Sequence, residues 1–207
     1  MENTSTRRKT EASATVEPLF RALNYFHPLH EDVEEYLSNH VFPCRFSKGK
    51  LLLKAGQVCD HVYFIKKGVV RGFIKEGPKD ITTWITAENE LVTSISGLDN
   101  NEPSLENMQA IEDCELLAIS NDDVQDLYQQ FPEFNIVIRK LLQQYYRDAE
   151  GRAFIVRLTS AESKYKHFLK HQSYLVNRIP LKYVASFLGI TIETLSRVRK
   201  KISIARS

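Results

Sequence analysis

Three hydrogen-bonding side chains recur at helical spacing near the end of the printed sequence, in "LKYVASFLGITIETLSRVRKK" over residues 181–201. Glu193, Arg197 and Lys200 follow one another at i, i+4 and i+7, so on a helix they lie within about 60° of one another. An arginine can donate two hydrogen bonds to guanine, a glutamate can accept one from cytosine, and a lysine can neutralise a phosphate. The spacing therefore predicts a helix that reads base pairs; the alternative is a surface ion pair between Glu193 and Arg197.

The residues around this trio predict a helix-turn-helix. Pro180 stands at the start of the first helix, and Ala185 is small enough for two helices to cross closely. Gly189 supplies the left-handed residue that ends the first helix, and Thr191 caps the second. The apolar positions that would form the core between the helices are Val184, Leu188, Ile190, Leu195 and Val198.

The charge is divided unevenly along the 207-residue chain. Residues 160–207 hold 10 Lys and Arg against 2 Asp and Glu, whereas residues 1–159 hold 18 against 24. A basic end on an acidic body favours contact with a polyanion, although a solvated basic surface is the simpler alternative.

The region from Val41 to Ile119 reads as short strands. Apolar runs of four to seven residues alternate with Gly, Pro, Asp and Asn groups that are typical of tight turns. Eight such runs predict an α+β protein that begins with an antiparallel β jelly roll (a double-stranded β-helix) or a barrel, within a domain over residues 17–131. The runs are "VFPCRF", "LLLK", "HVYFIKK", "VVRGFIKE", "ITTWIT", "LVTSI", "NMQAI" and "ELLAIS".

A long helix is predicted over residues 132–158, between the strands and the helix-turn-helix. An apolar stripe with a period of 3.5 residues on a helix that links two domains indicates pairing with a second copy of the chain. The alternative is a helix that lies on its own strand domain. The residues predicted to line the dimer contact are Phe134, Ile138, Leu141, Tyr145 and Arg152.

The remaining segments complete the predicted organisation. Residues 1–16 are polar and predict a disordered arm, and residues 159–207 contain the predicted helix-turn-helix domain. The three cysteines are far apart and suit a reduced, cytoplasmic protein. No apolar run is long enough to span a membrane, so no membrane partner is expected.

The chain resembles the Crp/Fnr family of bacterial transcription regulators over about residues 18–201. The resemblance rests on "KGKLLLKAG", "HVYFIKKGVVRGFIKE" and "CELLAIS" among the strands, and on "IETLSR" in the second helix of the pair. It implies a cyclic-nucleotide-binding-type jelly-roll sensor domain, a dimerisation helix and a DNA-binding helix-turn-helix domain of the winged type, with any wing supplied by "SYLVNRIP". The partners it implies are a palindromic DNA duplex, a second copy of the chain, RNA polymerase and an unknown small-molecule effector.

The resemblance also implies which residues contact DNA. Ile192 departs from the family pattern, which has arginine there, and can offer only apolar contact to a thymine methyl group. The operator is therefore expected to differ from the best-known family consensus. Base reading is assigned to Ile192, Glu193, Ser196 and Arg197, and phosphate contact to Lys182, Thr191, Thr194, Lys200 and Lys201.

A second departure concerns the effector. Family members that bind cyclic AMP pair its phosphate with an arginine and its ribose with a glutamate. Alignment backwards from "CELLAIS" puts Ser104 and Leu105 where arginine and serine would stand, while Glu90 keeps the ribose position. No Lys or Arg occurs between Lys79 and Arg139, so a buried phosphate would meet no cation. Cyclic AMP is not expected to bind in the usual way, and the pocket of Glu90, Ser104 and Leu105 holds another small molecule or none.

Other classes of function fit the sequence less well. A cupin-type enzyme needs two or three histidines on neighbouring strands, and His61 is the only one in the strand region. An iron–sulfur cluster needs about four cysteines. The histidine pairs at 27/30 and 167/171 lack a third ligand. We therefore expect no catalytic activity, metal or cofactor. The open alternative is a module that binds a cyclic nucleotide or another small molecule and whose helical end contacts protein rather than DNA.

Overall fold

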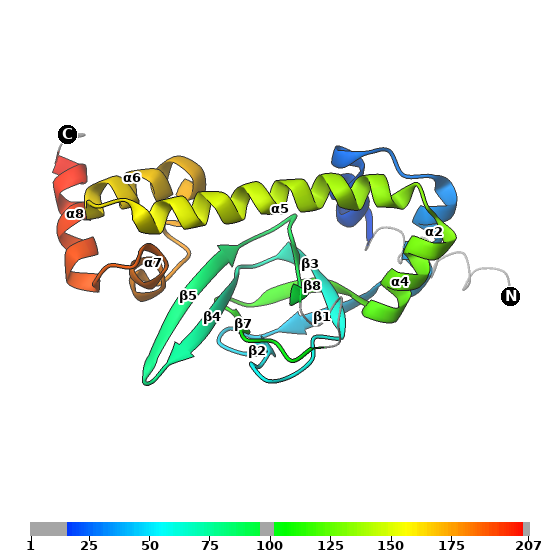
Figure 1. Cartoon of the computed structure of the whole chain (residues 1–207), viewed down its shortest axis with the longest axis horizontal. Helices are drawn as coiled ribbons and strands as arrows, with labels where there is room; N and C mark the ends of the chain where they lie inside the picture. The colour runs from blue at the N-terminus through cyan, green and yellow to red at the C-terminus, as the bar shows by residue number, and fades with distance from the viewer. Residues whose placement is uncertain (1–15, 96–101, 205–207) are drawn as a thin grey trace, which may run out of the picture.

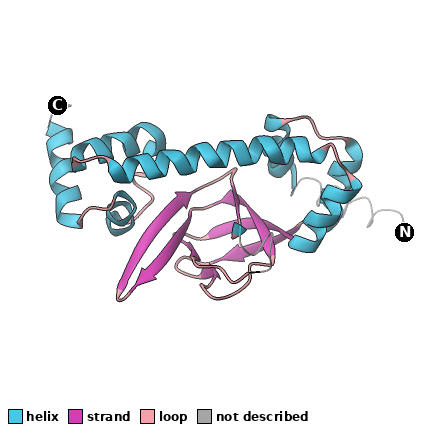
Figure 2. Cartoon of the chain, viewed as in Figure 1, coloured by secondary structure: helices cyan, strands magenta, loops and turns pink. Residues whose placement is uncertain are grey.

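The computed structural model describes residues 16–95 and 102–204 (Figure 1). Strands form one body beside a long helix, and the other helices gather towards the two ends of that helix (Figure 2). The α+β prediction is confirmed. Besides a helix over residues 16–26, the helical elements are α2 (Glu31–His40), α4 (Asn121–Gln130), α5 (Phe134–Arg157), α6 (Ala161–Gln172), the 3-10 helix η1 (Ser173–Leu175), α7 (Leu181–Leu188) and α8 (Ile192–Ile204).

The strands form two four-stranded antiparallel sheets. One has the order β1-β8-β3-β6 and the other β2-β7-β4-β5. Ile65 and Leu116 from the first sheet share a buried core with Val70 and Met108 from the second. Each strand falls within or beside one of the eight apolar runs, which confirms the jelly roll. The strands are β1 (Phe42–Phe46), β2 (Leu51–Leu53), β3 (His61–Lys67), β4 (Val70–Glu76), β5 (Lys79–Thr86), β6 (Leu91–Val92), β7 (Asn107–Ala110) and β8 (Cys114–Ser120).

The hairpin of β4 and β5 reaches from the strand body towards α7 (Figure 1). Gly77 turns the hairpin with φ at 58°, a conformation that costs glycine little. Gly72 on β4 allows the indole of Trp84 to lie directly against the main chain, since a Cβ atom there would come within 2.2 Å of the ring. The Nε1 of Trp84 donates to Glu106 at 2.8 Å, which fixes the ring in this position.

Helices cover the end of the strand body remote from α8. The hydroxyl of Ser120 caps α4 by accepting from the Asp123 amide at 3.1 Å. The helix over residues 16–26 and α2 pack their apolar sides against α4 and the start of α5 in one core. Of the predicted N-terminal arm, only Val16 lies within the described residues, and it is buried in that helix.

The predicted dimer stripe of α5 faces the chain's own strands. Phe134 and Leu141 are buried, and Ile138 packs against the same core. The Leu91 amide donates to Tyr145 Oη at 2.8 Å, and Tyr145 Oη donates to the Leu91 carbonyl at 3.1 Å. This side of α5 is therefore occupied within one chain, as in the alternative considered from sequence, because an apolar stripe does not specify its partner.

The helix-turn-helix forms as predicted. Gly189 adopts the left-handed conformation at φ 61° and ψ 43° and ends α7, and the Thr191 hydroxyl accepts from the Thr194 amide at 3.1 Å to cap α8. Lys164 on α6 is 8% exposed and donates from Nζ to the Leu188 carbonyl at 3.0 Å. This buried ammonium stabilises the carbonyl end of α7.

The wing expected from "SYLVNRIP" is not a strand hairpin. Residues 173–175 form η1, and residues 176–178 form a turn that leads to Pro180 at the start of α7. Leu175 and Ile179 point into the core of the helical domain and are buried. The segment is thus part of that core, because its apolar residues pack with those of α6 and α7.

Candidate nucleic-acid interface and effector cavity

One face of α8 is exposed and polar, and the opposite face is buried. Leu195 is fully buried and Ile202 is 9% exposed, so these two side chains anchor the helix. The residues predicted to read bases all lie on the exposed face: Ile192, Glu193, Ser196 and Arg197. The helix lies at the end of α5, away from the strand body (Figure 1).

The polar groups on this face have few partners in the chain. The guanidinium of Arg197 makes a long hydrogen bond of 3.4 Å to the Thr194 hydroxyl. The pKa of Glu193 is lowered by hydrogen bonds from its own amide and from Thr191, so the carboxylate stays ionised and able to accept. Donors and an acceptor that face solvent on one helix suit the edges of bases in a major groove.

The residues predicted to contact phosphate differ in what they already contact. Lys182 on α7 and Lys200 on α8 are exposed, and the Nζ of Lys182 lies 4.9 Å from the ring centroid of Tyr183. Lys201 instead pairs with Glu162 on α6 at 2.7 Å, an acid that also pairs with Lys166. Thr191 and Thr194 bond to each other in the cap of α8. A DNA phosphate that binds Lys201 would therefore have to replace its ion pair with Glu162.

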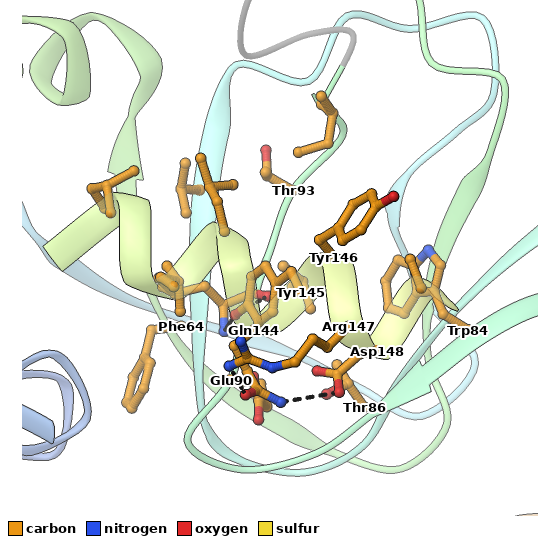
Figure 3. Close-up of a pocket in the computed structure, with 18 of the residues that line it drawn as sticks. Phe64, Trp84, Thr86, Glu90, Thr93, Gln144, Tyr145, Tyr146, Arg147 and Asp148 are labelled. Atoms are coloured by element: carbon orange, nitrogen blue, oxygen red, sulfur yellow. Dashed lines mark hydrogen bonds between the residues drawn. The ribbon is translucent and has the colours of Figure 1, made fainter. Parts of the chain in front are cut away.

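A cavity of about 1010 Å³ lies between α5 and the strand body and extends to the helical domain. Figure 3 shows Trp84 and Thr86 from β5 facing Tyr145, Arg147 and Asp148 from α5. Phe187 on α7 also lines it. The cavity thus touches the strand body, the long helix and the helix-turn-helix.

The charged groups in this cavity come from both sides. Burial raises the pKa of Glu90, while the nearby Tyr145 hydroxyl opposes that shift. Arg147 and Arg152 enter from α5, and burial lowers the pKa of Arg152. The absence of Lys and Arg between Lys79 and Arg139 therefore does not leave the cavity without a positive charge, because α5 supplies Arg147 and Arg152.

The predicted effector pocket is not brought together. Glu90 lines the cavity, but Ser104 and Leu105 do not. Ser104 is buried and its hydroxyl both donates to the Glu106 carbonyl at 2.9 Å and accepts from the Glu106 amide at 3.1 Å. Leu105 is 83% exposed. The structure does not place these two residues in the cavity, because the Ser104 hydroxyl bonds to the main chain of its own segment and Leu105 faces solvent.

Sequence reasoning also missed residues that the structure makes prominent. Tyr145 was assigned to a dimer contact, but its hydroxyl is fixed inside the chain beside the cavity. Arg71 and Arg178 were not singled out, yet Arg71 is 1% exposed and Arg178 pairs with two carboxylates. A lone arginine between apolar strand residues, as in "VVRGF", was the available signal for the first.

Comparisons with known proteins agree with this architecture. A family model described as a cyclic nucleotide-binding domain matches residues 43–131. The Transcriptional activator protein Anr of Pseudomonas protegens is 23% identical over 163 residues, which is 73% of this chain and 66% of that protein. The Cyclic AMP receptor protein of Thermus thermophilus is 26% identical over 187 residues, or 87% of this chain and 83% of that one. The chain is thus similar to regulators of the Crp/Fnr type and carries a match to their cyclic nucleotide-binding domain.

A solved structure shares the fold of this chain. FixK2 from Bradyrhizobium japonicum superimposes with a TM-score of 0.71 at 14% identity, over 80% of this chain and 85% of that one. The chain spans just under two thirds of the length of Anr. Within the described residues no helix is both long and apolar enough to cross a membrane, and no three His, Cys, Asp or Glu side chains gather as metal ligands.

Proposed function

We propose that this chain is a dimeric, sequence-specific DNA-binding regulator of transcription of the Crp/Fnr type. The observation that carries the proposal is the exposed face of α8, where Glu193 and Arg197 point away from a core that buries Leu195. The name of Anr, a transcriptional activator, supports the same function. Two such helices in one dimer would enter successive major grooves of a palindromic site. No catalytic activity or resident cofactor is part of this proposal, and the cell compartment we propose is the cytoplasm.

The dimer contact we propose is a second, exposed stripe of α5, about a quarter turn around the helix from the residues that meet the strands. Leu142, Tyr146 and Val156 are 50%, 67% and 51% exposed, which is high for large apolar side chains. Their positions follow the alternating steps of four and three residues that pair helices in a coiled coil. Exposed residues at this spacing are Asn135, Arg139, Leu142, Tyr146, Ala149, Ala153 and Val156.

We propose that the cavity beside α5 holds a small-molecule effector. Glu90, Arg147 and Arg152 give it charged groups of both signs, and Trp84 and Phe187 give it apolar walls. An effector that prefers one arrangement of α5 and the helical domain would shift the population of DNA-binding molecules. Cyclic AMP is not expected to bind there in the usual way, since Ser104 replaces the phosphate arginine and faces away. RNA polymerase is the expected protein partner on DNA.

The DNA proposal is tested with duplexes that the wild-type chain selects from a random pool. In gel shifts of a selected duplex, log K should fall linearly with log salt, by about 0.9 for each phosphate neutralised. Arg197→Ala should weaken binding by about 1–3 kcal/mol because it removes a base contact. Arg45→Ala, which removes an exposed arginine on β1, is the matched control and should bind normally. Failure to enrich any duplex would favour the module whose helical end contacts protein.

The dimer proposal is tested by sedimentation. Leu142→Asp places a charge in the proposed contact and should convert the dimer to a monomer, because an unpaired buried charge opposes association. Leu105→Asp changes an exposed leucine elsewhere and should leave the dimer intact. A wild-type chain that sediments as a monomer would contradict the proposal.

A further inference from the structure

Arg71 is a buried cation on β4 with partners on every side. It is 1% exposed, and its guanidinium donates from Nη2 to Asp80 at 2.9 Å, from Nη1 to Thr82 at 3.2 Å and from Nε to Gln109 at 2.9 Å. A charge taken from water is tolerated only when such partners replace the water. These contacts hold the guanidinium flat against the surface of the second sheet.

One of the aromatic rings that enclose Arg71 belongs to the helix-turn-helix. The Cζ atom of Arg71 lies 4.0 Å from the ring centroid of Phe73 and 3.8 Å from that of Tyr183 on α7. A guanidinium stacked on an aromatic face gains a cation–π attraction that strengthens when water is excluded. The contact therefore joins the strand body to α7.

Ser186 makes a second contact between the same two elements. Its hydroxyl accepts from the Thr82 amide at 2.9 Å and donates to the Asp80 carbonyl at 3.0 Å. β5 is the edge strand of its sheet, so its outer amides and carbonyls have no neighbouring strand to bond. A serine one turn beyond Tyr183 thus bonds the open edge of β5 to α7.

Arg178 forms a third contact, just before α7. Its guanidinium donates two hydrogen bonds to Glu88, at 2.8 and 2.6 Å, and also pairs with Glu112. Glu88 in turn accepts from the Gly68 amide at 2.7 Å. Bidentate pairing of this kind fixes direction as well as distance. The acids follow β5 and β7, so the pair ties the helical domain to both strands.

We infer that Arg71 and Arg178 are positioning residues for DNA reading, because with Tyr183 and Ser186 they fix the helix-turn-helix on the β4–β5 hairpin. We call the contacts of Arg71, Tyr183, Ser186, Arg178 and their acceptors the interdomain clamp. The clamp leaves the exposed face of α8 uncovered and sets its direction relative to α5. This inference rests on the proposed function. It identifies the contacts that keep the two α8 helices of a dimer at a fixed spacing.

The position of the clamp relates it to the cavity. β5 carries Asp80 and Thr82 in the clamp and Trp84 and Thr86 in the cavity wall. α7 likewise carries Ser186 in the clamp and Phe187 in the cavity wall. A molecule in the cavity therefore contacts the same strand and helix that the clamp joins. Its binding can thus change the orientation of α8.

Amide hydrogen exchange of the full-length chain tests whether the clamp holds in solution. The Thr82 amide reports on it directly, since its acceptor is Ser186. Tyr183→Leu and Arg178→Gln, which leave the jelly-roll core intact, should each speed exchange at Thr82 by about tenfold or more. Arg45→Gln, a change at an exposed ion pair on β1, should not. Protection of the Leu195 amide, bonded to the Thr191 carbonyl, checks that the helix-turn-helix stays folded.

A DNA measurement separates a positioning role from a merely structural one. The same variants are compared on a selected palindromic duplex and on a duplex that carries one half-site. Because a fixed spacing raises the effective concentration of the second reading helix, the variants should lower the ratio of palindrome to half-site affinity by about tenfold. Their half-site affinity should equal that of the wild type, and Arg178→Lys should restore part of the ratio.

The outcomes separate this inference from the proposed function. Faster Thr82 exchange together with a lower affinity ratio supports the positioning role. Unchanged exchange in both variants overturns the clamp, and faster exchange with an unchanged ratio overturns the positioning role. A wild-type chain that selects no duplex overturns the DNA proposal and with it the positioning role, whereas the exchange result still decides whether the clamp exists.

Discussion

Arg197 in the helix-turn-helix and Arg71 on the neighbouring strand β4 differ in how many of their hydrogen-bond donors already have partners within the chain. Arg197 on α8 is exposed and makes one long hydrogen bond of 3.4 Å. Arg71 on β4 is 1% exposed and has acceptors at three nitrogens and an aromatic ring within about 4 Å on each of two residues. Donors that face solvent can form bonds with a new partner, whereas donors already bonded inside the chain fix its shape.

The largest effect we expect from this difference is on folding stability. Arg71→Ala removes a buried cation and its stacking, and should lower the free energy of unfolding by about 3 kcal/mol. This is the lower end of the range for buried pairs because the Asp80 side chain, at 39% exposure, can be hydrated. Arg197→Ala should change stability by less than about 0.5 kcal/mol. Urea unfolding of the two variants measures both, and equal losses would contradict the comparison.

A smaller loss of stability is expected at the N-cap of α8, the helix that carries Arg197. Thr191→Ala removes the acceptor for the Thr194 amide and should lower stability by about 1 kcal/mol. Thr191→Ser keeps the hydroxyl and is the matched control. Thermal unfolding followed by circular dichroism measures the difference. A loss that is the same for both variants would show that the hydroxyl does not hold the helix.

A third effect is confined to acid pH. Arg178 lowers the pKa of Glu88 from 4.5 to about 2, so the folded state holds the proton less tightly than the unfolded state. Such a group adds stability that is complete above about pH 4.5 and is lost as the pH falls towards 2. The stability difference between the wild type and Glu88→Gln should therefore shrink across this interval. Urea unfolding at several pH values measures this difference. A stability difference that grows as the pH falls would contradict a lowered pKa of Glu88 in the folded state.

The elements that were predicted correctly depend on local signals. Gly189 is required by the left-handed turn between α7 and α8, and Thr191 caps α8. The eight strand runs are bounded by turn residues whose preferences act within a few positions. These features need no knowledge of what packs against them.

The errors arose where a residue's partner lies far away in the sequence. α5 carries two stripes, and the sequence does not say that Phe134, Leu141 and Tyr145 meet the strands while Leu142 and Tyr146 face solvent. The contact between Arg71 and Tyr183 joins positions more than a hundred residues apart. Ser104 was aligned by counting residues, but its direction is set by a turn that the count cannot reveal.

The placement of Trp84 has a practical consequence. It is the only tryptophan in the chain, and it lies against Gly72 with its indole N–H bonded to Glu106 while its ring lines the cavity. Indole emission depends on local polarity and on the strength of that hydrogen bond. The protein thus carries a built-in optical reporter at the cavity wall, and candidate effectors can be screened by fluorescence without attaching a label.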